Sequence, residues 1–215
     1  MSHYFENDKN LKSDEQLIKV SVNNTDLTFL TDSGVFSKKG LDFGTRSLLE
    51  SIPDVKGNIL DLGCGYGAIG IYIAKTTNSK VDMIDINERS VKLAKRNSIL
   101  NNVDVNIMSN DGFDNIDERY DFIISNPPIR IGKEKLYQLL NDALKHLKKD
   151  GELWIVINKN QGVKSLINDF EKEYTVEVVK KNKGFYIIKL KNHWRMSKYL
   201  LKFKVSGLLL KLKKI

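Results

Sequence analysis

The chain has 215 residues, of which 41% are hydrophobic and 29% charged, with only three prolines. This composition is typical of one ordinary globular domain with a substantial core, and it excludes disordered, fibrous and repeat proteins. The formal net charge is +8, yet residues 178–215 hold 12 of the 35 Lys and Arg and no Asp or Glu, so we expect a polyanion or a membrane surface to contact that end.

Metal content and cellular location can be predicted from a few residue types. Cys64 is the single cysteine, so no internal disulfide can form, and His3, His146 and His193 are too scattered to predict a metal site. The first ten residues, MSHYFENDKN, lack the apolar run of a secretory signal, and no run of about 18 apolar residues predicts a membrane span. We therefore expect a cytoplasmic protein without a metal ion.

The first predicted elements form a small N-terminal part, residues 1–52. Residues 16–36 alternate apolar and polar side chains on both sides of NNTD, which predicts a β-hairpin. A loop and a short helix follow, with Asp42 as the helix cap and Pro53 as its stop.

After Pro53, short apolar runs alternate with stretches of helical spacing, which favours a mainly parallel sheet covered on both faces. Buried strands are predicted at 58–62, 80–86, 103–108, 120–125 and 151–157, and helices at 67–76, 88–100 and 134–149. Two later runs, 175–181 and 184–191, predict an antiparallel hairpin at the edge of the sheet. We assign residues 53–192 to this core domain.

The sequence DLGCGYG, residues 61–67, predicts a ligand-binding turn between a strand and a helix. Gly63, Gly65 and Gly67 let a ligand approach the backbone without meeting a Cβ. Gly65, Gly67 and Gly70 also satisfy the G-x-G-x-x-G pattern of dinucleotide sites, and Asp85 lies 20 residues past Gly65. A turn that only joins strand to helix is the third interpretation.

Asp61 separates the two ligand classes, because a carboxylate repels a pyrophosphate but attracts an ammonium or a sulfonium group. S-adenosylmethionine (SAM) carries both cations and no phosphate, so Asp61 favours SAM. Asp85 can accept hydrogen bonds from ribose hydroxyls in either ligand. Cys64 has no evident base nearby, and we expect it to be a small buried residue rather than a nucleophile.

The sequence SNPP follows the strand predicted at 120–125, which brings Asn126 to the same sheet edge as the glycines. An amine attached to an aromatic base is a poor nucleophile because its lone pair spreads into the ring. If Asn126 Oδ1 and the Pro127 carbonyl accept its hydrogens, the lone pair can point at a methyl group, and the prolines hold both acceptors in place. The alternative is a proline turn that only ends the strand.

Several of these sequences resemble the class I SAM-dependent methyltransferases, and specifically the methyltransferase small domain family, which includes 16S ribosomal RNA guanine-N2 methyltransferases. The resemblance is carried by DLGCGYG, IDIN and SNPPIRIGK, and further by HYFEN, TDSGVFSKKGLDFGTR and GFYIIKLK. It covers about residues 3–192. It implies a Rossmann-like α/β fold with a seven-stranded, mainly parallel sheet whose last strand is antiparallel.

The resemblance also implies roles for individual residues. SAM is expected to contact Asp61, Gly63, Cys64, Gly65, Gly67, Asp85, Ile86, Asn126 and either Asn110 or Asp111. The catalytic turn is expected to be Asn126, Pro127, Pro128 and Ile129. Substrate contacts are expected from Phe36, Lys38, Arg46, Arg130 and Lys133, within a pre-core segment that includes residues 42–46 and a segment just beyond the turn. Arg130 and Lys133 would serve equally well as solvated charges, and Asp42 as only a helix cap.

The identity of the substrate is the least constrained expectation. Similar turns in adenine-N6 DNA and protein-glutamine methyltransferases usually have an aromatic residue after the second proline, where this chain has Ile129, so a DNA adenine is disfavoured. We expect methyl transfer to an exocyclic base amine, first of all guanine N2 of 16S rRNA in the small ribosomal subunit. Protein-glutamine or adenine-N6 methylation and a noncatalytic RNA-binding protein are the alternatives.

Residues 193–215 extend past the resemblance as a basic tail. One helical stripe among lysines holds Leu201, Val205, Leu208, Leu212 and Ile215, whereas LKFKV alternates like a strand. We expect contact with RNA, an acidic membrane surface or a second subunit, or else an extra element that covers the core.

Overall fold

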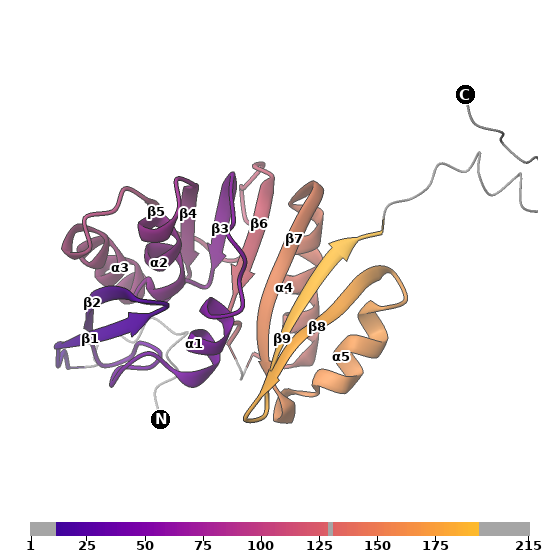
Figure 1. Ribbon diagram of the computed structural model, residues 1–215, viewed down its shortest axis with the longest axis horizontal. Helices are drawn as coiled ribbons and strands as arrows, with labels where there is room; N and C mark the ends of the chain where they lie inside the picture. The colour runs from indigo at the N-terminus through magenta and orange to yellow at the C-terminus, as the bar shows by residue number, and fades with distance from the viewer. Residues whose placement is uncertain (1–11, 129–130, 194–215) are drawn as a thin grey trace, which may run out of the picture.

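A seven-stranded sheet forms the centre of the structure, a computed structural model that describes residues 12–128 and 131–193 (Figure 1). The strand order is β5-β4-β3-β6-β7-β9-β8. The strands are β3 (Asn58–Leu62), β4 (Lys80–Asp85), β5 (Asn106–Ser109), β6 (Tyr120–Ser125), β7 (Leu147–Asn158), β8 (Tyr174–Asn182) and β9 (Phe185–Asn192). Neighbours from β5 to β7 are parallel, whereas β9 is antiparallel to both β7 and β8. The predicted Rossmann-like sheet with an antiparallel last strand is confirmed.

Helices cover both faces of this sheet. They are α1 (Phe43–Leu49), α2 (Ala68–Thr76), α3 (Glu88–Leu100), α4 (Lys133–Lys145) and α5 (Val163–Phe170), with a 3-10 turn, η1, at Lys159–Gln161. One hydrophobic core joins α1, α2, α3 and the N-terminal hairpin, and it includes Phe29, Ile71 and Leu93. A second core joins α4 and α5 to the sheet and includes Leu140 and Phe170. The central strands are buried on both faces, so apolar residues stand next to one another in them, as at Ile59–Leu60 and Ile123–Ile124.

The N-terminal hairpin consists of β1 (Gln16–Val22) and β2 (Thr25–Thr31). Its two turn residues, Asn23 and Asn24, have φ of 46° and 62°, as a tight two-residue hairpin turn requires. The second strand ends at Thr31, five residues earlier than predicted, and residues 32–41 form a loop that leads to α1.

Two buried amides, Asn97 in α3 and Asn101 at its C-cap, complete the free edge of β2. Asn97 accepts from Leu30 N at 2.7 Å and donates to Leu30 O at 2.9 Å. Asn101 accepts from Thr28 N at 3.0 Å and donates to Thr28 O at 2.7 Å. These bonds replace the missing strand neighbour, so the hairpin packs into the first core instead of forming a separate unit.

The C-terminal half differs from the sequence prediction in two places. The helix expected at 134–149 ends at Lys145, because Tyr120 N donates to His146 O at 2.9 Å and draws the following residues into β7. Helix α5 was not predicted, and it is a short segment between two strands.

Some predicted features lie outside the described residues. They are HYFEN near the start, Ile129 and Arg130 after the prolines, and the tail 193–215 apart from His193. Among the helices that the structure does describe, none combines the length and the apolar character needed to cross a membrane.

Candidate active site

A cleft of about 590 Å³ opens at the carboxyl ends of β3, β4 and β6. Parallel sheets of this kind bind ligands at that edge. The lining includes most of the residues predicted for the site, namely Phe36, Gly63, Cys64, Gly65, Asp85, Ile86, Asn110, Asp111, Asn126, Pro127 and Pro128. The glycine loop and the proline turn therefore border the same cleft.

The glycine loop presents bare backbone to the cleft. Gly63 and Gly65 have φ of 72° and 56°, and a Cβ added to either would project into open space. Gly67 has a different reason to be glycine: it has φ of 99°, and a Cβ there would lie 2.8 Å from Ile71 Cδ1. The first two glycines thus border the ligand space, whereas the third permits α2 to pack closely against the loop.

Hydrogen-bond donors of this loop are used within the protein. Gly63 N and Cys64 N both donate to Ile84 O at 2.9 Å, and Gly65 N donates to Asp85 Oδ2 at 2.8 Å. A pyrophosphate requires free N–H groups at such a turn. These three N–H groups are therefore not free to bind a pyrophosphate, which favours the SAM interpretation over a dinucleotide.

Asp61 is fully buried at the end of β3 and is not among the residues that line the cleft. Its Oδ2 accepts from Gly70 N at 2.8 Å, in the first turn of α2, so the positive end of that helix is already neutralised. Its Oδ1 is buried and has no hydrogen-bond partner among the described residues. Burial, with a smaller contribution from the Asp85 charge, raises the pKa of Asp61 to about 7. An orphaned carboxylate oxygen of this kind fits a cationic ligand nearby.

Asp85 holds the other side of the loop. Its Oδ1 accepts from Asn87 N and its Oδ2 from Gly65 N, both at 2.8 Å. Burial raises its pKa. Each oxygen keeps a lone pair for a further donor, such as a ribose hydroxyl. Ile86 follows with 40% of its surface exposed, as an apolar wall of the cleft.

Asn110 and Asp111 both line the cleft, and their hydrogen bonds distinguish them. Asn110 Nδ2 donates to Gly112 O and Asp114 O, each at 3.0 Å, so its amide hydrogens shape the loop. The Asp111 carboxylate has no side-chain hydrogen bond within the described residues. Asp111 is thus the better candidate to meet an amine of the ligand.

The proline turn is held from two sides. Ser125 Oγ donates to Leu62 O at 2.7 Å, which ties the end of β6 to β3. Asn126 Nδ2 donates to Thr45 Oγ1 at 2.9 Å and, at 3.5 Å, to Asp42 Oδ1. Asp42 is the N-cap of α1, as predicted, since its Oδ1 accepts from Thr45 N at 3.0 Å. The same carboxylate also reaches the turn, a contact that could not be read from the sequence.

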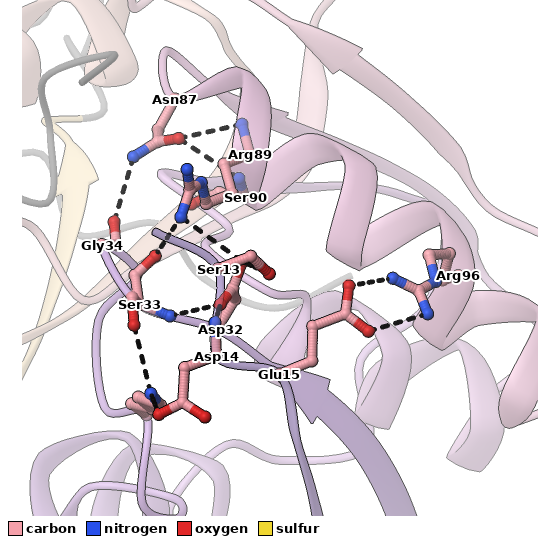
Figure 2. A network of polar contacts seen from close by, with 11 residues as sticks. Ser13, Asp14, Glu15, Asp32, Ser33, Gly34, Asn87, Arg89, Ser90 and Arg96 are labelled. Carbon is pink, nitrogen blue, oxygen red and sulfur yellow. Dashed lines mark hydrogen bonds and ion pairs between the residues drawn. The ribbon is translucent and has the colours of Figure 1, made fainter. Parts of the chain in front are cut away.

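A polar network holds the start of the loop 32–41 in place (Figure 2). Asp32 is buried and accepts from Asp14 N at 2.6 Å, Ser13 Oγ at 2.9 Å and Ser33 N at 2.7 Å. Burial alone would raise the pKa of Asp32, but these hydrogen bonds and the Arg89 charge hold it below the usual range. The network stabilises the start of the loop that carries Phe36 to the cleft.

The loop is also joined to the start of α3, which follows Asp85 within three residues. Arg89 Nη1 donates to Ser33 O at 2.9 Å, and Asn87 Nδ2 donates to Gly34 O at 3.3 Å (Figure 2). The segment that carries Phe36 and the turn that follows Asp85 therefore form one connected wall.

Three predicted substrate residues do not line the cleft. Lys38 Nζ is paired with Asp14, Arg46 Nη1 donates to Ser21 O at 2.7 Å, and Lys133 Nζ lies 3.3 Å from Asp169 Oδ2. Each of these cations is engaged within the protein, so the structure gives no support for their binding a substrate. Other lining residues had no sequence signal beyond helical spacing, among them Lys135, Gln138, Leu139 and Asp142 of α4.

Comparison with protein families and sequences gives a consistent result. A family model described as Methyltransferase small domain matches residues 26–189. A protein of Bacillus subtilis named YbxB is 45% identical over 88% of this chain and 98% of its own length. Ribosomal RNA small subunit methyltransferase C of Haemophilus influenzae is 36% identical over 78% of this chain and 52% of its own length. The chain thus spans about half the length of such rRNA methyltransferases.

Solved structures show the same fold. The 16S rRNA N2 G1207 methyltransferase RsmC of T. thermophilus, in complex with AdoMet and guanosine, has a TM-score of 0.74 at 22% identity, covering 83% of this chain and 51% of that one. The ribosomal protein L11 methylase of Lactobacillus delbrueckii has a TM-score of 0.62 at 23% identity, covering 71% and 80%.

Proposed function

This chain belongs to the methyltransferase small domain family, and we propose that it is a SAM-dependent enzyme that methylates guanine N2 in 16S rRNA of the small ribosomal subunit. One observation carries the proposal: Asn126, with its amide hydrogens turned toward α1, borders the same cleft as the glycine loop. In this arrangement the proposed cofactor site and the proposed acceptor for an amine would border one cleft.

The proposed cofactor fits the charges of the loop. SAM, when bound, supplies a methyl group on a positively charged sulfur. Asp61 offers a buried oxygen without a partner, and Asp85 offers two oxygens with spare lone pairs. Asp111 is proposed to accept from the adenine amine and Ile86 to contact the adenine ring.

The proposed chemistry needs two acceptors and no strong base. Asn126 Oδ1 and the Pro127 carbonyl would accept the two hydrogens of the base amine, so that its lone pair is localised and aimed at the methyl group. As the new N–C bond forms and the old S–C bond breaks, the nitrogen becomes positively charged and acidic. Its proton then passes to solvent. Pro128, which also lines the cleft, would pack on the base.

Lysines at the end of β8 and on the turn between β8 and β9 support a nucleic-acid substrate. Lys181 and Lys183 are exposed, and neither has a carboxylate partner within the described residues. Lys183 Nζ lies 5.0 Å from the centre of the Phe43 ring, and Phe43 directly follows Asp42. Phosphates that flank a target base could therefore be neutralised next to the proline turn.

The names of the relatives support RNA as the polymer. Several relatives at 35–37% identity are named ribosomal RNA small subunit methyltransferase C. The T. thermophilus neighbour is described with AdoMet and guanosine bound. We assign the same substrate class to this chain as part of the proposal.

Transfer of radiolabelled methyl groups from SAM would test the proposal. The acceptors are isolated small ribosomal subunits, naked rRNA, duplex DNA and total protein, each with the wild type and with Asn126→Ala. We expect label in the small subunit or its RNA, lost in the variant. Label in protein or DNA would overturn the substrate, and measurable SAM binding without transfer to any acceptor would favour a noncatalytic RNA-binding protein.

A further inference from the structure

We propose that Asp42 and Thr45 are positioning residues that hold the Asn126 amide in one of its two orientations, with its oxygen on the cleft side. The inference rests on the proposed function, since it concerns the group expected to accept a hydrogen from the target amine. Asn126 Nδ2 donates to Thr45 Oγ1 at 2.9 Å and to Asp42 Oδ1 at 3.5 Å.

The Asp42 carboxylate decides which end of the amide faces α1. A carboxylate only accepts hydrogen bonds, whereas a threonine hydroxyl can donate or accept. If the amide were turned over, its oxygen would face the carboxylate with no hydrogen between the two acceptors, an unfavourable contact. Thr45 alone would tolerate both orientations, so the selective group is Asp42.

Asp42 and Thr45 are themselves held in place. Thr45 is only 4% exposed, and its N–H donates to Asp42 Oδ1 at 3.0 Å, so the helix cap fixes the carboxylate. Gly44 leaves the space that this requires, because a Cβ there would lie 3.0 Å from Asp42 Oδ1 and 2.9 Å from the Phe185 ring. In the sequence DFGT, Asp42 thus caps the helix, Gly44 leaves room for its carboxylate, and Thr45 supplies the hydroxyl.

The orientation leaves the acceptor available. Asn126 Oδ1 accepts no hydrogen bond within the described residues, and it is not fully buried. Asn126, Asp42 and Thr45 all line the cleft. Turning the amide over would instead present two hydrogens to the amine, which would repel its hydrogens.

Three variants separate polarity from shape. Asp42→Asn keeps a good helix cap, because its amide oxygen can take the place of Oδ1, but it removes the negative charge that disfavours the turned-over orientation of Asn126. Thr45→Val keeps the shape of Thr45 and removes its hydroxyl. Thr45→Ser keeps the hydroxyl and is the rescue variant.

The first measurement needs no substrate. Hydrogen exchange of the Asn126 side-chain amide is followed by ¹⁵N NMR, with its signals identified by their loss in Asn126→Ala. We expect slow exchange in the wild type and in Thr45→Ser, and exchange faster by about tenfold in Thr45→Val and Asp42→Asn. Equal exchange in all four proteins would overturn the inference, whether or not the protein is an active enzyme.

The second measurement is methyl transfer to the substrate established for the wild type. Both disruptive variants should lower kcat by about tenfold with unchanged KM, SAM affinity and thermal stability, and Thr45→Ser should retain the wild-type kcat. Parallel losses of stability or SAM affinity would indicate a merely structural role and overturn the inference. A wild type without activity whose amide exchange nevertheless behaves as expected would refute the proposed function and leave the positioning role standing.

Discussion

Asp61 is the residue at which folding and the proposed cofactor binding would oppose each other. Its carboxyl is fully buried, one oxygen has no partner within the described residues, and its pKa rises from 3.8 to about 7. A folded-state pKa above the unfolded value means that the native state binds more protons between these pH values. The contribution to stability is therefore fully present below about pH 4 and is lost as pH rises through about 7.

Asp61→Asn should remove this pH dependence. Asparagine can still accept from Gly70 N but carries no charge. Without SAM, the wild type should lose stability from pH 5 to pH 8 and the variant should not. The difference in unfolding free energy between the two proteins should therefore shift by roughly 2–3 kcal/mol in favour of the variant. Urea unfolding at both pH values measures this difference. A constant difference between the two proteins would show that Asp61 does not titrate in this range.

The same substitution should weaken SAM binding, because the proposed partner of a cationic group loses its charge. Titration calorimetry at pH 8 should show an affinity lower by at least about tenfold. In the wild type the affinity should rise with pH through about 7, as the carboxyl ionises, and in the variant it should not. An unchanged affinity would remove Asp61 from the proposed site.

At the scale of elements, α3 connects the N-terminal hairpin to the glycine loop. Asn97 is fully buried, and besides its bonds to Leu30 its Nδ2 donates to Tyr66 O at 2.8 Å, inside the loop. Asn101, one turn later, bonds to Thr28 but not to the loop. The two amides therefore dock the same strand, and only Asn97 also bonds to the glycine loop, where we propose that the cofactor binds.

Asn97→Leu should cost about 2–4 kcal/mol of stability, because it leaves buried N–H and C=O groups without partners, and it should also weaken SAM binding. Asn101→Leu is the matched control: it should lower the urea midpoint similarly and leave the SAM affinity unchanged. Calorimetric titration under conditions where both variants are folded separates the two effects. Equal losses of affinity in both variants would refute the specific link between Asn97 and the loop.

At the scale of the whole molecule, two exposed lysines, Lys181 and Lys183, lie near the sheet edge at which the cleft opens, since β7 ends there beside Phe185. Figure 1 shows α1 and the turn between β8 and β9 along the same edge, although they are more than 130 residues apart in sequence. Lys159 N donates to Gly184 O at 2.7 Å, which brings a third lysine to this turn. We expect this edge, and not the opposite one, to carry the RNA backbone.

The double variant Lys181→Gln/Lys183→Gln should weaken binding to rRNA and reduce the slope of log affinity against log salt by about one to two, since up to two phosphate contacts are lost. Lys92→Gln/Lys95→Gln is the control with the same change in charge, on exposed positions of α3. Filter binding at several salt concentrations gives both slopes. Equal slopes in the two variants would mean that this turn does not bind the backbone.

Local pattern was enough to predict the order of elements and the shared sheet edge, because both depend on hydrophobic periodicity and on the geometry of parallel strands. The helix at 88–100 was predicted with its observed bounds. Contacts between distant segments could not be predicted in this way. The bond from Asn126 to Thr45 joins residues 81 positions apart, and the ion pair that keeps Lys38 out of the cleft depends on the path of the loop.

The identity of the methylated atom tests the central claim most directly. Small ribosomal subunits are incubated with labelled SAM and the wild type or Asn126→Ala, and the RNA is digested to nucleosides and separated by chromatography. We predict label in N2-methylguanosine with the wild type and none with the variant. Label in another nucleoside, or equal N2-methylguanosine with the variant, would contradict the assignment of guanine N2 to a site built on Asn126.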